Sequence, residues 1–261
     1  MKITIIGSGN IGSAFVTGLL RDGSIVPGNI SLTDSLQKAL APFAAKGVAT
    51  MQNNVEAVKK ADVVVLCVKP YLIRELIEEI TPSLSGNSLL VSFAAGITLG
   101  QLKLFSGKRP LFRVIPNTAM AVCQSMTCIA ASEDTSAAQH EMMLGLFSRV
   151  GKAMMINESL MNAATVIASC GTAFALRYLR AAMSAAVETG FRPDVAETMI
   201  AQTMLGAALL TSGSGNHPEA EIDRVTTPKG ITIKGLNEME HAGFSSAVIR
   251  GIRAAFDVLN S

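Results

Sequence analysis

The stretch that decides the fold is residues 2–12, which read Lys-Ile-Thr-Ile-Ile-Gly-Ser-Gly-Asn-Ile-Gly. An apolar run of strand type leads directly into Gly7, Gly9 and Gly12, and a segment of helical period begins there. Between a strand and a helix, the first two glycines allow a tight turn and close approach of backbone N–H groups to a pyrophosphate. The third allows the helix to pack closely on the strand. The helix N-terminus favours the anionic charge. We therefore predict dinucleotide binding; a glycine-rich turn without a ligand is the alternative.

Residues 1–157 alternate short β-branched runs with segments of helical period, which is the pattern of βαβ units around a parallel sheet. Strands are predicted at residues 2–6, 30–33, 62–68, 88–93, 111–115, 127–131 and 153–156. Helices are predicted near residues 11–20, 37–45, 55–60, 72–80, 99–105 and 137–149. We therefore expect an α/β, Rossmann-type, doubly wound domain over residues 1–157.

The second half of the chain has a different sequence pattern. From Ser159 the β-branched runs vanish, and Ala, Leu and Met recur at helical spacing, which predicts an all-helical domain over residues 158–261. Residues 160–187 are apolar on nearly every side, and such a helix is expected to be buried all round. A domain of this size cannot wrap it, so we expect a second copy of the chain to cover it. The alternative is a domain core with a few exposed alanines.

Composition narrows the class of protein. Apolar residues make up 49% and charged residues 16% of the 261 residues, against about 25% charged in an average soluble domain, which excludes disorder. A membrane span is not expected, because Arg177, Arg180 or Gln202 interrupts the richest apolar stretches. The net charge of +2 indicates no nucleic-acid partner.

The cysteines and histidines indicate neither disulfides nor a metal site. None of the four cysteines forms a Cys-x-x-Cys pair, and the three histidines lie far apart in the sequence. Thiols in apolar surroundings suit a reducing compartment. The N-terminus enters a strand without a signal-peptide pattern. We therefore expect a cytoplasmic protein without a metal.

The end of the second predicted strand reads Thr33-Asp34-Ser35. Asp34 stands 22 positions after Gly12, where a carboxylate would bind a ribose 2′-hydroxyl and favour NAD. If Asp34 turns away, Thr33, Ser35 and Lys38 could instead hold the 2′-phosphate of NADP. Asp34 could also simply cap the following helix. The choice between NADP and NAD stays open.

Further motifs occur in this order along the chain: Asn-Val-Glu-Ala-Val at 54–58, Ala-Asp-Val-Val-Val-Leu-Cys-Val-Lys-Pro at 61–70, Ser-Phe-Ala-Ala-Gly-Ile-Thr at 92–98, Arg-Val-Ile-Pro-Asn-Thr at 113–118, His-Pro at 217–218 and Val-Thr-Thr-Pro-Lys-Gly-Ile-Thr at 225–232. Together they resemble the pyrroline-5-carboxylate reductases over nearly the whole chain. The resemblance implies NAD(P)H-dependent reduction of 1-pyrroline-5-carboxylate to L-proline, the last step of proline biosynthesis. It also implies a helical domain of the 6-phosphogluconate dehydrogenase C-terminal type and a homodimer through that domain, and it allows a pentamer of dimers.

Several of these motifs are expected at the cofactor edge of the sheet. Lys69-Pro70 ends a buried strand, residues 94–96 follow the next strand, and Asn117 follows the fifth, so the crevice rule places them beside a dinucleotide. The resemblance assigns Asn117 to the cofactor side as well, whereas Lys69 alone could be a solvated strand-end lysine. The predicted cofactor residues are Gly7, Gly9, Asn10, Ile11, Gly12, Thr33, Asp34, Ser35, Asn54, Val68, Lys69, Pro70, Ala94, Ala95, Gly96 and Asn117.

The substrate is expected at residues 226–232, a loop that enters a helix whose free N–H groups can bind a carboxylate. The predicted substrate residues are Thr227, Lys229, Gly230, Ile231 and Thr232. In the family, a threonine that Thr232 matches is placed to hydrogen-bond the ring nitrogen, so Thr232 is the catalytic candidate. A protonated cyclic imine is already electrophilic, and alignment with the hydride donor is the main requirement.

Two segments depart from the family pattern. Residues 228–232 read Pro-Lys-Gly-Ile-Thr instead of Pro-Gly-Gly-Thr-Thr, and residues 168–174 read Ala-Ser-Cys-Gly-Thr-Ala-Phe instead of Ser-Gly-Ser-Gly-Pro-Ala-Tyr. Both lie in the predicted helical half. They affect the expected substrate pocket more than the cofactor site.

Two other functions are less favoured by the sequence. A β-hydroxyacid dehydrogenase needs a lysine base on the long helix after the Rossmann domain, and residues 160–186 contain none. A non-catalytic dinucleotide sensor would not need the Thr232 loop. The sequence therefore favours the reductase.

Overall fold

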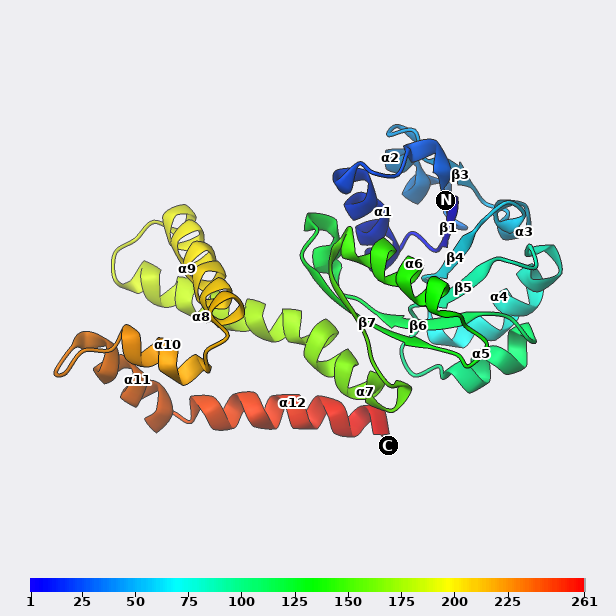
Figure 1. Ribbon diagram of the computed structural model, residues 1–261. Coiled ribbons are helices and arrows are strands. Elements are labelled where there is room, and N and C mark those ends of the chain that lie inside the picture. Colours follow the sequence, from blue (N-terminus) through cyan, green and yellow to red (C-terminus); the bar gives the residue numbers. More distant parts are fainter. Residues whose placement is uncertain (261) are drawn as a thin grey trace. The chain divides into compact units, whose positions relative to one another are not determined.

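The computed structural model describes residues 1–260 and divides into two compact units, residues 1–170 and residues 171–259 (Figure 1). The division falls within a long helical stretch, after the change of sequence pattern at residue 158. The predicted domain boundary at 157/158 stays a prediction. Ser261, the last residue of the predicted second domain, lies outside the described residues.

The first unit is built on an eight-stranded sheet in the order β3-β2-β1-β4-β5-β6-β7-β8. The strands are β1 (Ile3–Ile6), β2 (Ile30–Thr33), β3 (Ala49–Met51), β4 (Val63–Leu66), β5 (Leu89–Ser92), β6 (Leu111–Ile115), β7 (Ser125–Ala131) and β8 (Gly151–Met155). Neighbours are parallel except β6 and β7. This order and direction confirm the predicted Rossmann-type fold class.

Helices cover both faces of the sheet (Figure 1). Side chains alternate along each strand, so that Val63 and Val65 of β4 join one apolar cluster and Val64 and Leu66 join the other. The first cluster includes residues of α1 (Asn10–Asp22), α2 (Gln37–Ala44) and α6 (Ala137–Ser148). The second includes residues of α3 (Asn54–Val58), α4 (Ile73–Ile80) and α5 (Leu99–Ser106). Short 3-10 turns are η1 (Pro27–Asn29), η2 (Pro70–Leu72), η3 (Thr81–Ser83), η4 (Thr118–Val122) and η5 (Glu158–Leu160).

Two features of the sheet were not predicted. β7 runs antiparallel to β6, because the connection between Ile115 and Ser125 holds only the single turn η4 and is too short for a crossover helix. β3 was not predicted, since its three half-buried residues, Ala49–Met51, carry no clear alternation of apolar and polar side chains.

The chain is helical from residue 158 onward, as predicted. In the first unit η5 is followed by α7 (Met161–Ala164) and by η6 (Thr165–Cys170), a π-helical turn that periodicity did not predict. The second unit contains α8 (Gly171–Glu188), α9 (Pro193–Ser214), α10 (Pro218–Arg224), α11 (Ile231–His241) and α12 (Phe244–Asn260). Tyr178 of α8 and Phe244 of α12 make an edge-to-face ring contact within this unit. No residue of Gly171–Glu188 is buried in the single chain.

Candidate functional site

The carboxyl ends of four central strands meet at one edge of the sheet. Ile6 of β1 is in register with Thr33 of β2 and Leu66 of β4, and Leu66 is in register with Ser92 of β5. The ladder continues past the strand ends, where Gly7 N donates to Thr33 O at 2.8 Å. The loops that leave these strands surround a cavity of about 690 Å³. Ligands of open α/β sheets bind in this position.

Most of the predicted cofactor residues line this cavity. They are Gly7, Gly9, Asn10, Ile11, Thr33, Asp34, Ser35, Asn54, Val68, Lys69, Pro70, Ala94 and Ala95. The three predicted residues outside the lining are Gly12, which packs beneath the turn, Gly96, which is exposed at φ +78°, and Asn117. As cofactor ligands, all of these residues stay predictions.

The glycines of the turn have different structural reasons. Gly7 has φ +103°, and a Cβ there would lie 2.8 Å from the carbonyl oxygen of Cys67. A Cβ on Gly12 would collide with the carbonyl of Gly7, so Gly12 permits the close packing of α1 on the turn. A Cβ on Gly9 would meet no atom of the chain within 4 Å. Because Gly9 lines the cavity, its open side is the space that a bound group would occupy.

The start of α1 is suited to an anion. Gly9 is the N-cap residue, no side chain within the described chain caps this helix, and its first turn carries no acidic residue. The first N–H groups of a helix have no partner within it and carry the positive end of the helix dipole. The residues present therefore fit the pyrophosphate of a dinucleotide.

Asp34 is bound to the glycine-rich turn. Ser8 donates to Asp34 Oδ2 from both its backbone nitrogen (2.8 Å) and its hydroxyl (2.7 Å), and Leu36 N donates to Oδ1 at 2.9 Å. Burial opposes ionisation of this carboxyl, but these hydrogen bonds, led by the Ser8 hydroxyl, hold the pKa of Asp34 below its ordinary value. Asp34 is therefore a carboxylate that ties the glycine-rich turn to the end of β2.

A second pair of side chains organises the same end of the cavity. Thr33 Oγ1 donates to Asn54 Oδ1 at 2.7 Å, which turns the amide oxygen of Asn54 toward Thr33. The amide N–H groups of Asn54 are left on the other side as donors. Gln52 Nε2 donates to the carbonyl of Ser35 at 2.7 Å and steadies the loop after β2.

Sequence reasoning missed part of the cavity wall. The lining also includes Ile6, Cys67, Leu72, Glu75, Leu76, Glu79 and Phe93. The four residues at or on α4 recur at i, i+3, i+4 and i+7, so helical periodicity could have placed them on one face. Burial raises the pKa of the Cys67 thiol, which favours its neutral form.

Both polar atoms of the Asn117 side chain have hydrogen-bond partners within the chain. Asn117 Oδ1 accepts from Ala119 N at 2.9 Å and caps η4. Asn117 Nδ2 donates to the carbonyl of Ala168 in η6 at 2.8 Å. The residue is 7% exposed. The expected contact of the Asn117 amide with a dinucleotide stays a prediction.

The predicted substrate loop forms a tight turn at the start of α11. Gly230 N donates to Thr227 O at 2.9 Å, so the expected N–H donor of Gly230 is engaged within the turn. Lys229 occupies the left-handed region at φ +62°, where glycine is favoured. A Cβ on Gly230 would collide with the Thr227 hydroxyl. Ile231 and Thr232 open α11, which no side chain of the described residues caps. Their backbone N–H groups are the donors available to an anion.

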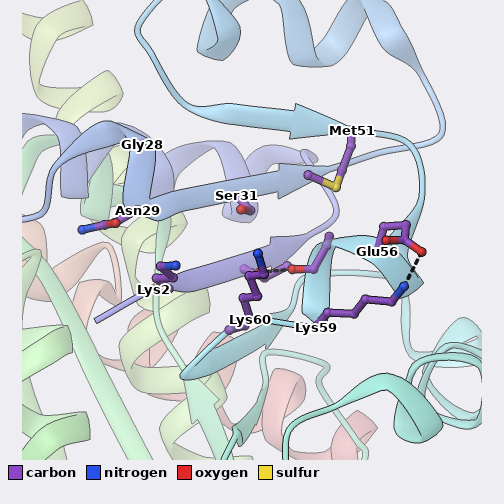
Figure 2. A pocket seen from close by; sticks show the side chains of 11 residues that line it. Lys2, Gly28, Asn29, Ser31, Met51, Glu56, Lys59 and Lys60 are labelled. Carbon is purple, nitrogen blue, oxygen red and sulfur yellow. Dashed lines mark hydrogen bonds and ion pairs between the residues drawn. The ribbon is translucent and has the colours of Figure 1, made fainter.

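A smaller cavity of about 380 Å³ lies elsewhere on the same unit (Figure 2). Lys2 and Asn29, which precede β1 and β2, belong to its lining. One of its cations, Lys59, is paired with Glu56 at 2.5 Å. None of the predicted site residues lies here, and the carboxyl-end cavity remains the candidate site.

Two features of residues 1–260 bear on other partners. No group of three or more His, Cys, Asp or Glu side chains is arranged to hold a metal ion there. One helical stretch, Glu158–Glu188, is long and apolar enough to cross a membrane by length and composition, with a mean hydropathy of 1.4. Arg177 and Arg180 lie within this stretch. One such helix is weak evidence for a span, and the absence of a membrane partner stays a prediction.

The comparisons with known proteins agree with this geometry. Residues 158–260 match a family model described as pyrroline-5-carboxylate reductase dimerisation, and residues 2–96 match one described as NADP oxidoreductase coenzyme F420-dependent. Pyrroline-5-carboxylate reductase 2 of Dictyostelium discoideum is 37% identical over 96% of this chain and 89% of its own length. The chain belongs to the pyrroline-5-carboxylate reductase family.

Other members of the pyrroline-5-carboxylate reductase family match the chain just as broadly. The Escherichia coli K12 reductase is 33% identical over 96% of this chain and 94% of its own length. Reductase 1 of Dictyostelium discoideum is 35% identical, and the chain spans 48% of that longer protein. The solved reductase of Coxiella burnetii has a TM-score of 0.89 at 29% identity and covers 99% of this chain and 97% of its own. The NADP-bound reductase of Plasmodium falciparum, at 24% identity and a TM-score of 0.90, covers the same shares and shows the same fold.

Proposed function

We propose that this protein is a pyrroline-5-carboxylate reductase that uses NADPH or NADH to reduce 1-pyrroline-5-carboxylate to L-proline, the last step of proline biosynthesis. The observation that carries the proposal is the cavity at the carboxyl edge of the sheet. Its lining contains the glycine-rich turn and most of the other predicted cofactor residues, in a chain of this family.

In this proposal the first unit binds the dinucleotide. The N-terminus of α1 receives the pyrophosphate, while Asp34, Ser35 and Asn54 lie at the ribose end. Small residues at Ala94 and Ala95 leave room for a flat ring against the backbone. The bound cofactor supplies a hydride from its nicotinamide ring.

The second unit provides the substrate groups. The N–H groups of Ile231 and Thr232 bind the substrate carboxylate, and the Lys229 ammonium adds a positive charge to the same turn. The Thr232 hydroxyl orients the ring nitrogen or passes it a proton. The imine carbon gains the hydride, the nitrogen carries the proton, and the C=N double bond becomes the C–N single bond of proline. No nucleophile is required, because the protonated imine is itself electrophilic.

The test is NADPH and NADH oxidation with racemic 1-pyrroline-5-carboxylate, followed at 340 nm, with chiral detection of the product. We expect L-proline to form in step with cofactor loss. Oxidation of 3-hydroxyisobutyrate with NAD as the oxidant serves as the control for a β-hydroxyacid dehydrogenase. Absence of proline formation, with cofactor binding intact, would favour the sensor function instead.

The dimerisation domain indicates that the protein forms homo-oligomers. We propose that the contact lies on the helical unit, as a homodimer or as a pentamer of dimers. The support is the apolar surface of α8 and α9, where Leu176 is 58% and Leu209 is 59% exposed in the single chain. Light scattering of the purified protein measures the mass, and a monomer at micromolar concentration contradicts this proposal. We also propose a cytoplasmic location, testable by fractionation.

A further inference from the structure

The π-helical turn η6 is the one irregular segment in the long helix that follows the sheet. It spans Thr165–Cys170 between α7 and α8 and coincides with part of the segment in which the sequence departs from its family. A π-turn inside an α-helix is rare and is frequently found at a functional site. The turn is therefore a candidate for more than packing.

The turn is attached to the sheet beside the cofactor cavity. Val166 and Ala168 are buried, and Ala168 belongs to the apolar cluster that also contains Ala94, a lining residue of the cavity, and Ile115, the last residue of β6. The strand order places β5 and β6 at the far side of the cavity from β2. Asp34, the proposed ribose-binding residue, follows β2. A dinucleotide with its pyrophosphate at α1 extends its nicotinamide toward β5 and β6.

Polar contacts from β6 and its loop hold this helical stretch. Arg113 Nη2 donates to Asn162 Oδ1 at 3.2 Å, ahead of the turn. Asn117 Nδ2 donates to Ala168 O at 2.8 Å, within the turn. The second bond is buried and joins residues 51 positions apart. A buried hydrogen bond that loses one partner leaves the other unsatisfied, so the bond resists opening.

We propose that Asn117 is a positioning residue, which holds η6 against the carboxyl end of β6 and thereby fixes the backbone at residues 168–170 beside the hydride-transfer end of the cofactor. The inference rests on the proposed function. It differs from the family-based expectation that Asn117 binds the cofactor directly, because both polar atoms of its side chain have partners within the chain.

The discriminating variants are Asn117→Ser and Asn117→Asp. Both keep an oxygen that can cap η4, and neither keeps the amide donor to Ala168. Ser136→Ala, which removes the capping side chain of α6 and lies outside the cavity lining, is the control for a general loss of helix stability. We expect kcat to fall about tenfold or more in both Asn117 variants, while the Kd for NADPH stays within about threefold of wild type. The deuterium isotope effect with 4-deuterated NADPH should rise, because hydride transfer becomes slower relative to product release.

A measurement without substrate separates this proposal from the proposed function. Amide hydrogen exchange of the peptides covering residues 161–171 should be faster in Asn117→Ser than in wild type and unchanged in Ser136→Ala. A Kd for NADPH weakened at least tenfold with kcat unchanged would make Asn117 a cofactor ligand and overturn the proposal. Unchanged exchange together with full activity would also overturn it. If wild type forms no proline, the proposed function falls, while faster exchange in Asn117→Ser still supports the hold on η6.

Discussion

Gly9 offers the sharpest test of the cofactor site. Its backbone lies at φ −63° and ψ −174°, which is extended backbone that valine adopts readily. A Cβ at this position meets no atom of the chain within 4 Å, so Gly9→Val should leave the fold and the thermal unfolding temperature nearly unchanged. The added side chain must instead occupy the open side of the turn, where a pyrophosphate would approach the backbone donors of α1.

The expected loss follows from those donors. A hydrogen bond to a charged group contributes about 1.5–3 kcal/mol, so displacing the pyrophosphate from one donor should weaken NADPH binding on the order of 10- to 100-fold. Fluorescence titration of NADPH and NADH measures the Kd. Gly145→Ala on α6, where a Cβ is equally free and lies outside the cavity lining, should leave the Kd unchanged and raise the unfolding temperature slightly, because alanine favours a helix interior over glycine by up to about 1 kcal/mol.

A third variant checks the structural half of the reasoning. Gly12→Ala places a Cβ against the carbonyl of Gly7, so it should lower the unfolding temperature, unlike Gly9→Val. If Gly9→Val is stable and binds both dinucleotides as tightly as wild type, the glycine-rich turn is not the phosphate cradle. In that case the assignment of the cavity must be abandoned.

Further predictions concern three residues. Asp34→Ser should raise the ratio of kcat/KM with NADPH to that with NADH by about tenfold or more, because it removes a negative charge near the 2′ position; an unchanged ratio would leave Asp34 only as the tie to Ser8. Folding lowers the pKa of Asp34, so its contribution to stability is present above the unfolded pKa of about 3.9 and is lost as the pH falls through the lower folded pKa. Between about pH 6 and pH 3, the unfolding temperature of wild type should therefore fall more than that of Asp34→Asn. Thr232→Ala should lower turnover by about 10- to 1000-fold with Thr232→Ser recovering much of it, whereas near-normal turnover with a lowered unfolding temperature would mean that Thr232 only stabilises α11. Asparagine tolerates the left-handed backbone, and Lys229→Asn should raise the KM for 1-pyrroline-5-carboxylate about tenfold because the charge is lost. Lys229→Gly should show the same KM without a lower unfolding temperature. If both variants keep the wild-type KM, the ammonium lies away from the substrate.

The amino-acid sequence by itself determined the part of the site that depends on local spacing and parallel topology. Gly7, Gly9 and Gly12 are spaced for one turn, and in a parallel sheet the loops after successive strands share one edge. The sequence therefore predicted that Asp34 and Lys69 would lie at the same cavity, and the cavity lining confirms that grouping. The change from β-branched runs to helical spacing likewise predicted the helical second half.

The tertiary structure alone decided which polar groups satisfy one another. The carboxylate of Asp34 binds Ser8, which is 26 residues earlier, and the amide of Asn117 binds Ala168, which is 51 residues later. The direction of β7 and the π-helical turn were also beyond the sequence pattern. Periodicity reports which face of a segment is buried. It does not report which donor meets which acceptor once two distant segments pack together and water is excluded, and that choice follows from the requirement that buried polar groups be hydrogen-bonded.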